Sequence, residues 1–323
     1  MRIFAFDPAD HAEHFAEHGW AYVPGGLTAE FLTELRRFVG ESRGGHRLEG
    51  AAIAGKKEQA LYAPPDEVDF PGEVFDVVAE ACGLNRPTMT LSERHLKAYD
   101  PDADPEPVAH KDRFASQVSM GLSIDIPEGS RLVLYPNDDV SPNPLNISAA
   151  LPASLPPERR PETILASARE VEIADGAGDV VVFRGSAIWH KRRNPAAAVN
   201  LYLKMNDFGC DPLGEDPATE GLRAATIEAL GSNGAGLDDS VPVLSRQLDE
   251  ITRRYSRDDW SESHWARVWD EEPVLLSPRQ FELIGRVDGE RSLRDLAAAD
   301  GEAVKSEIRA LAERGIIDLT RRS

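Results

Sequence analysis

Four strand-like runs between residues 116 and 208 are joined by turns and loops, with no helical pattern between them. The runs are SQVSMGLSIDI, SRLVLYPN, GDVVVFRGSAIWH and AAAVNLYLKMNDF, and a weaker alternation, TMTLSERHLKAY, precedes them. Parallel strands need long crossover connections, which are usually helices, so short non-helical connections favour antiparallel pairing. The middle of the chain is therefore predicted to be a mainly β sandwich or jelly roll.

Helical patterns flank this β-rich region on both sides. Before it, we predict three helices, of which the second is capped by Thr28 and the third lies in PGEVFDVVAEACG. After it, TEGLRAATIEALG and VPVLSRQLDEITRRYSRDDW also read as helical. A capping-box start at Ser277, two further short helices and the terminal run GIIDLT indicate a winged-helix-like unit. We predict a domain over 1–240, a helical linker over 241–269 and a winged-helix-like module over 270–323.

The charge of the chain argues against two classes of partner. Lys and Arg number 36 against 56 Asp and Glu, which gives a formal net charge of −20. Such a polyanion should repel nucleic acid and anionic membrane surfaces. The two cysteines, Cys82 and Cys210, have no paired spacing, which excludes a thiolate zinc site and a disulfide scaffold. With no signal-peptide pattern at the start and no long apolar run, we expect a cytoplasmic protein.

Three residues of the β-rich region have the types and spacing of a metal site. His110 and Asp112 are separated by one residue, and in an extended segment positions i and i+2 point to the same side. His190 follows a second apolar strand downstream. Two histidines and one carboxylate form the facial triad of non-haem Fe(II) oxygenases, although zinc accepts the same ligands.

These residues also carry a family resemblance. HFAEHGWAYVPGGLTAEFLTELRRFV, LKAYDPDADPEPVAHKD and GDVVVFRGSAIWH, in this order, resemble the phytanoyl-CoA dioxygenase-like branch of Fe(II)/2-oxoglutarate oxygenases. The resemblance covers roughly residues 10–206. It implies a double-stranded β-helix, a cupin-like jelly roll, in which His110, Asp112 and His190 bind Fe(II). It also implies 2-oxoglutarate and O2 as cosubstrates.

One position departs from the pattern of that family. The far carboxylate of 2-oxoglutarate normally meets an Arg or Lys on the strand after the distal histidine, where this chain has Asn200. An amide can donate a hydrogen bond to a carboxylate but cannot neutralise it. The cationic alternatives are Lys204 and Lys97, which we rank first with Asn200 assisting, and then Arg192 and Arg193.

The sequence predicts the substrate less specifically than the metal. Adjacency to the motifs suggests that the substrate pocket includes Arg94, Arg113, Phe114, Gln117, Tyr135, Trp189 and Arg192. Basic residues close to the motifs (Arg113, Lys191, Arg192 and Arg193) suggest a substrate with a carboxylate or phosphate. Related halogenases lack the carboxylate ligand that Asp112 supplies here, so the resemblance implies hydroxylation of a C–H bond. The expected substrate is a small metabolite or natural-product intermediate.

Two other functions remain open from the sequence. The C-terminal module resembles units that capture peptides on peptide-modifying enzymes, so the substrate could be a peptide or protein. The same module also resembles dimerisation units of bacterial oxygenases, and we favour this role, with a homodimer as its consequence. If no residue binds the far carboxylate, the chain could instead be a non-enzymatic β-helix binding protein.

Overall fold

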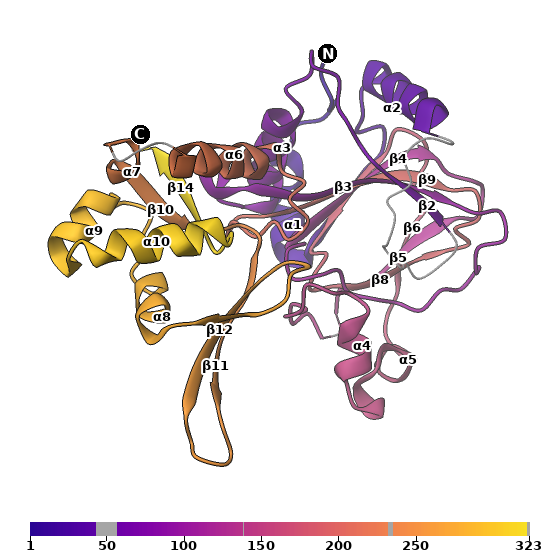
Figure 1. The fold of residues 1–323 in the computed structure, drawn as a ribbon. Helices are drawn as coiled ribbons and strands as arrows, with labels where there is room; N and C mark the ends of the chain where they lie inside the picture. Colours follow the sequence, from indigo (N-terminus) through magenta and orange to yellow (C-terminus); the bar gives the residue numbers. More distant parts are fainter. Residues whose placement is uncertain (43–56, 138, 232–234, 322–323) are drawn as a thin grey trace. The chain divides into compact units, whose positions relative to one another are not determined.

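The computed structural model describes residues 1–42, 57–137, 139–231 and 235–321, which form two compact units. The first unit is Met1–Gly209 and the second is Cys210–Ser323. Each is coloured along the chain in Figure 1. No helix of the described ranges is long and apolar enough to cross a membrane.

The described residues of the first unit form two antiparallel sheets and five α-helices. Its strands are β1 (Trp20–Val23), β2 (Lys57–Leu61), β3 (Thr90–Tyr99), β4 (Val118–Asp125), β5 (Arg131–Tyr135), β6 (Val171–Ile173), β7 (Val180–Phe183), β8 (Trp189–Arg193) and β9 (Val199–Asn206). Its helices are α1 (Ala9–His18), α2 (Ala29–Ser42), α3 (Phe70–Cys82), α4 (Ala150–Ser154) and α5 (Pro161–Ile164), with 3-10 turns η1 (Arg86–Thr88) and η2 (Pro157–Arg159).

The strand order is that of a jelly roll. One sheet has the order β1-β7-β4-β9-β3-β2, and the other has the order β6-β5-β8. His110 also forms an isolated antiparallel bridge with His190, which places His110 beside β8 in the three-stranded sheet. From β3 onward the chain passes back and forth between the two sheets, which wraps both around one interior. The predicted mainly β jelly roll is confirmed.

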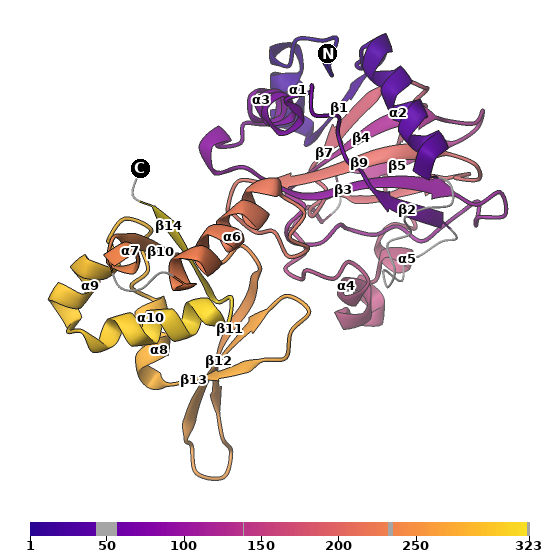
Figure 2. The ribbon, with the colours of Figure 1, turned by 45° about the horizontal axis from the view of Figure 1, so that its top comes forward.

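The alternation of side chains along β4 explains why polar residues line the interior between the two sheets. Met120 and Leu122 lie on the face that packs against the helices, in one core with Phe31 of α2 and Val74 of α3. Figure 2 shows α2 lying over this sheet. Because successive side chains of a strand point to opposite faces, Ser119, Gly121 and Ser123 face the space between the sheets. Polar residues of this inner face contribute to the candidate site described below.

The Pro-rich segment 141–162 after β5 contacts Asp112 through Asn143, and its helical part packs behind the three-stranded sheet. In the structure this segment includes α4, η2 and part of α5, and Leu151 packs with Val133, Tyr135 and Trp189 on the outer side of the three-stranded sheet. The segment therefore supports the sheet from behind.

The second unit is a mixture of helices and short sheets. Its helices are α6 (Pro217–Gly231), α7 (Ala235–Asp238), α8 (Pro278–Ile284), α9 (Leu293–Asp300) and α10 (Ala303–Glu313). Its strands are β10 (Ser240–Leu244), β11 (Leu248–Tyr255), β12 (Glu262–Val268), β13 (Val274–Leu276) and β14 (Ile317–Arg321). The capping box at Ser277, helices α8 to α10 and strand β14 lie where the sequence placed them. Their winged-helix arrangement stays a prediction.

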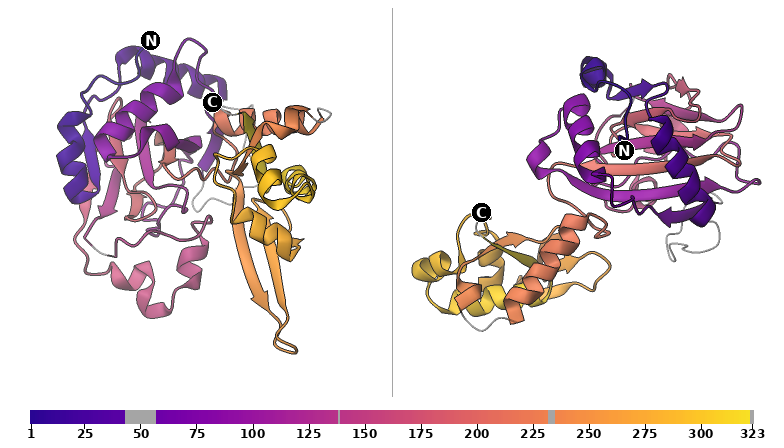
Figure 3. Two further views of the ribbon diagram at one scale, coloured as in Figure 1. Left: turned by 90° about the vertical axis from the view of Figure 1, so that its left-hand side faces the viewer. Right: turned by 90° about the horizontal axis from the view of Figure 1, so that it is seen from above.

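The predicted helical linker over 241–269 is wrong. These residues form β10, β11 and β12, and the β11–β12 hairpin is visible in the left view of Figure 3. Val241 and Val243 are β-branched and pair with β14, so tertiary pairing overrides the weak helical pattern. The unit boundary also differs from the predicted 240, because α6 packs against β14 and belongs to the second unit.

Candidate metal centre

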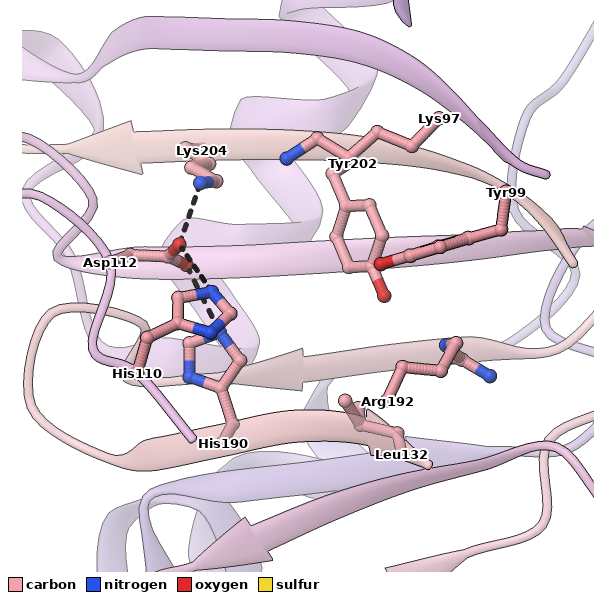
Figure 4. Close-up of a pocket in the computed structure, with 9 residues that line it drawn as sticks. All are labelled: Lys97, Tyr99, His110, Asp112, Leu132, His190, Arg192, Tyr202 and Lys204. Atoms are coloured by element: carbon pink, nitrogen blue, oxygen red, sulfur yellow. Dashed lines mark hydrogen bonds and ion pairs between the residues drawn. The ribbon is translucent and has the colours of Figure 1, made fainter. Parts of the chain in front are cut away.

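The structure brings the three predicted ligands together. One ligand atom from each of His110, Asp112 and His190 can be chosen so that all lie within 4.8 Å of one another. Nε2 of His110 lies 3.9 Å from Oδ1 of Asp112, and Nε2 of His190 lies 3.7 Å from Oδ2. The two imidazole centroids are 4.4 Å apart (Figure 4). This geometry leaves room for one ion between the three side chains.

Backbone hydrogen bonds hold the ligand-bearing segments in register. The N–H of His110 donates to the carbonyl of His190, and the N–H of His190 donates to the carbonyl of His110, both at 2.9 Å. The N–H of Asp112 donates to the carbonyl of Gly185 at 2.9 Å. The His-x-Asp loop is thus paired with the turn and strand that carry the distal histidine, so the ligands are placed by the sheet itself.

The protonation state of His190 suits a metal ligand. Burial lowers its pKa, with Asp112 acting in the opposite direction, so the ring is expected to be neutral at pH 7. Its Nδ1 lies 3.0 Å from the carbonyl oxygen of Ile188. A proton on Nδ1 satisfies that carbonyl and leaves the lone pair of Nε2 for a metal ion, as is usual for metal-binding histidines.

The carboxylate of Asp112 is ionised and held on both oxygens. Burial works against its charge, but Lys204, the two histidines and Lys97 together outweigh burial and keep the pKa of Asp112 well below its usual range. Nζ of Lys204 donates to Oδ1 at 2.7 Å, and Oγ of Ser119 donates to Oδ2 at 2.7 Å. The side-chain amide of Asn143 donates to the backbone carbonyl of Asp112 at 2.9 Å. Sequence reasoning missed Ser119 and Asn143.

A pocket opens from the metal ligands into the interior. Its lining comes from β3, β5, β8, β9 and the His-x-Asp loop, and consists of Lys97, Tyr99, His110, Asp112, Leu132, His190, Arg192, Tyr202 and Lys204. Figure 4 shows these side chains converging from different strands. Of the predicted cosubstrate residues, Lys97, Arg192 and Lys204 therefore reach the pocket.

Two other cosubstrate candidates do not line the pocket. Asn200 is buried beside Ser123, with 3.4 Å between its Nδ2 and the Ser123 Oγ. Arg193 points to the other face of β8, where it pairs with Glu106 and Glu170. For Arg193 the reason is strand alternation, since Arg192 rather than Arg193 shares the inner face with His190.

Arg192 has one edge of its guanidinium available. Its Nη1 and Nη2 donate to the two oxygens of Asp175 at 3.0 and 2.8 Å, which occupies the end of the group. Its buried Nε has no hydrogen-bond partner within the described ranges. An arginine presents five N–H donors in a fixed planar fork, so the edge formed by Nε and Nη2 can still receive a second carboxylate.

Two tyrosines border the same part of the pocket. Tyr99 and Tyr202 belong to β3 and β9, and Figure 4 shows their hydroxyl groups pointing toward one another. Burial raises the pKa of Tyr99, so this phenol remains a neutral hydrogen-bond donor. The sequence contained a signal for both tyrosines. Tyr99 lies two residues from Lys97 and Tyr202 lies two residues from Lys204, so each tyrosine shares a strand face with a predicted cosubstrate residue.

Most predicted substrate residues lie outside the pocket. Arg94 donates to the carbonyl of Tyr62, the Gln117 side chain accepts from the backbone of Asp207, and Tyr135 donates to Glu170. Trp189 is fully buried behind the three-stranded sheet, and Phe114 lies against Phe208. Only Arg192 lines the described pocket, because adjacency in sequence places alternate residues on opposite faces.

The basic residues that suggested an anionic substrate are all paired with carboxylates. Arg113 meets Glu93, Lys191 meets Glu106, and Arg192 meets Asp175. Arg193 is paired as described above. The cluster therefore gives no evidence for an anionic substrate, since its charges are already compensated.

Gly185 is a position where one added methyl group should damage the site. A Cβ there would lie 2.0 Å from Oγ of Ser119 and 2.8 Å from Oδ2 of Asp112, so Asp112 and Ser119 would have to move. We expect Gly185→Ala to weaken metal binding by about 10- to 100-fold, the range seen when groups that orient metal ligands are lost. The measurement is titration with Mn(II).

A matched control for this variant is Gly40→Ala. Gly40 lies in α2, and a Cβ there meets nothing within 4 Å. Metal binding should be unchanged, and the helix should gain up to about 1 kcal/mol of stability. Equal metal affinity of the Gly185 and Gly40 variants would contradict the described packing around Asp112.

No family model and no curated protein matches the chain. Among solved structures, it resembles a prolyl-4-hydroxylase from Pseudomonas putida (18% identity, covering 62% of this chain and 97% of that chain, TM-score 0.42). It also resembles the non-haem α-ketoglutarate-dependent carbocyclase SnoK from nogalamycin biosynthesis (12%, 61% and 83%, TM-score 0.47). A third is EctD from S. alaskensis with bound Fe (15%, 64% and 83%, TM-score 0.46). Because the TM-scores are below 0.5, the function is inferred from this chain's own residues.

Proposed function

We propose that this protein is an Fe(II)- and 2-oxoglutarate-dependent oxygenase. The observation that supports this best is that one pocket contains both a two-histidine, one-carboxylate group and a carboxylate-binding edge of Arg192. A dicarboxylate with a keto group next to one carboxylate can bind the metal through that end and Arg192 through the other. This assignment prefers Arg192 as the anchor of the far carboxylate to Lys204 and Lys97, which the sequence ranked first.

The donor set fits iron. His110 and His190 would supply imidazole nitrogens and Asp112 a carboxylate oxygen, and three protein ligands leave positions for a chelating cosubstrate and O2. When bound, such a centre supplies the oxidative decarboxylation of 2-oxoglutarate and the oxidation of a substrate C–H bond. The same ligands would accept zinc, so identification of the metal requires the experiment described below.

The charges of the pocket suit a divalent ion together with a dianion. The three basic residues that line it, Lys97, Arg192 and Lys204, are paired with Glu93, Asp112 and Asp175, and Glu93 also accepts from Arg113 outside the pocket. The cations of the pocket are therefore compensated before anything binds. A divalent cation adds two positive charges in a buried place, and the two carboxylates of 2-oxoglutarate restore neutrality.

The residues of the chain then have distinct tasks. Arg192 would fix the far carboxylate of the cosubstrate, with Tyr99 and Tyr202 as neutral donors beside it. Asp112 and the two histidines would bind the metal and take no part as acid or base. We propose that the substrate is a small molecule that is hydroxylated at a C–H bond. Because the basic residues described above are already paired with carboxylates, they do not require the substrate to carry a charge.

Anaerobic titration tests this proposal directly. Addition of Fe(II) and then 2-oxoglutarate should produce the weak visible charge-transfer band of the chelate, and the band should be absent with succinate. Zn(II) serves as the control, because its filled d shell gives no such band. If 2-oxoglutarate neither produces a band nor changes the affinity for Fe(II), the protein does not use it as a chelating cosubstrate.

A further inference from the structure

We infer that Lys204 is a built-in counter-ion of Asp112 that couples binding of the metal to binding of the dianionic cosubstrate. The inference rests on the proposed function, which requires both to bind in one pocket. Lys204 would weaken the binding of the metal alone and would lose this effect once a dianion is present. Lys204 would therefore control the binding of the metal and the cosubstrate, and it would not itself contact the reacting atoms.

The position of Lys204 is the first ground for this inference. Its side chain is 6% exposed, and its Nζ lies 2.7 Å from Oδ1 of Asp112 and 3.3 Å from Oε2 of Glu93. Strand β9 places it on the inner face, in register with Glu93 of β3. The ammonium group therefore bonds directly to the one carboxylate of the triad, where a divalent ion would add a second positive partner.

Glu93 is the second ground, because it gives Lys204 another partner. This carboxylate is buried, and burial works against its charge, but Lys204, Lys97 and His95 together outweigh burial and keep its pKa well below its usual range. It also accepts from Arg113 and pairs with Lys97, each at 3.0 Å. Lys204 can thus remain compensated by Glu93 when a metal ion takes over Asp112.

Electrostatics sets the direction of the effect. An ammonium beside a carboxylate repels a divalent cation that approaches the same carboxylate, and the repulsion is strong where water is scarce. A dianion next to the metal attracts both cations and offsets this repulsion. By linkage, the metal must then raise the affinity for the dianion by the same factor as the dianion raises the affinity for the metal.

A purely positioning role for Lys204 predicts the opposite result. If the lysine mainly holds Asp112 in the correct orientation, its removal should loosen the carboxylate and weaken metal binding. Two variants separate these roles. Lys204→Met removes both the charge and the hydrogen bond, whereas Lys204→Gln removes the charge and keeps a donor. In both, Glu93 keeps Lys97 and Arg113 as partners, so the interior retains compensated charges.

The test is a Mn(II) titration of the full chain, with and without N-oxalylglycine, an unreactive dianion that mimics 2-oxoglutarate. Free Mn(II) is measured by electron paramagnetic resonance. We expect both variants to bind Mn(II) alone more tightly than the wild type by about tenfold, and the enhancement by N-oxalylglycine to fall by about tenfold, within the usual range of coupling between sites. Lys191→Met is the matched control, because Lys191 lies on β8 but pairs with Glu106 outside the pocket.

The outcomes distinguish this inference from the proposed function. If both variants bind Mn(II) alone no more tightly than the wild type, the counter-ion role is overturned while the proposed function stands. If only the Met variant binds Mn(II) more weakly than the wild type, Lys204 positions Asp112 by its hydrogen bond, and the inference is likewise overturned. If the wild type binds Mn(II) but N-oxalylglycine has no effect on it, both proposals fail. Glu93→Gln, which leaves Lys204 less compensated, should weaken Mn(II) binding and provides an independent check.

Discussion

His110→Ala is expected to abolish tight metal binding and, with it, any turnover. His110 supplies one of three ligands, and changes to groups that merely orient ligands already cost about 10- to 100-fold in affinity, so loss of a ligand should cost at least about 100-fold. The side chain of His110 is 45% exposed, whereas those of His190 and Asp112 are almost fully buried. Its removal therefore disturbs the core least. Calorimetric titration with Fe(II) under nitrogen or with Mn(II) measures the loss.

The control for this variant is His18→Ala. His18 is the last residue of α1 and is well exposed, so its loss removes an imidazole without touching the pocket. Metal affinity should be the same as in the wild type. Retention of full affinity by the His110 variant would show that the metal binds elsewhere, and the proposed function would then lose its basis.

Arg192→Met is expected to remove binding of 2-oxoglutarate while leaving metal binding largely intact. Arg192 offers the only unpartnered guanidinium edge among the described pocket residues, and a charge-assisted bidentate contact is the strongest fit for a carboxylate. We expect the dissociation constant for 2-oxoglutarate to rise by at least about 30-fold, because loss of one partner of a buried charge pair costs more than 2 kcal/mol. Titration of the metal-loaded protein gives this value.

The buried pair with Asp175 requires a second variant. Removal of Arg192 alone leaves the Asp175 carboxylate uncompensated, which costs about 3–5 kcal/mol of folding free energy. Arg192→Met combined with Asp175→Asn avoids the unpaired charge, and the single Asp175→Asn change serves as control with the arginine present. The double variant should fold and still fail to bind 2-oxoglutarate. Normal binding by the folded double variant would assign the anchor to Lys97 instead.

The strand-rich fold could be predicted from local patterns, and the triad could be predicted from its residue types together with the family resemblance. Alternation in the four strand-like runs sets which faces are apolar, and the spacing of His110 and Asp112 fixes their common direction. The distal His190 follows a strand in the same way. None of these statements requires knowledge of which strands become neighbours in space.

The residues around the triad could not be predicted for the same reason. Ser119 and Asn143 meet Asp112 only because β4 and the segment after β5 are brought beside the His-x-Asp loop, and neither residue belongs to a motif. Arg192 and Arg193 differ only in strand face, and a one-residue difference decides which enters the pocket. The β11–β12 hairpin was missed because its pairing outweighs a weak helical pattern.

The paired backbone bonds between His110 and His190 tie the metal centre to closure of the jelly roll. The two histidines are distant in sequence, and each donates its N–H to the carbonyl of the other. A chain still emerging from the ribosome would lack a complete set of ligands until the distal strand had docked. Iron would therefore be taken up late, by an almost finished domain, which limits capture of unsuitable ions during synthesis.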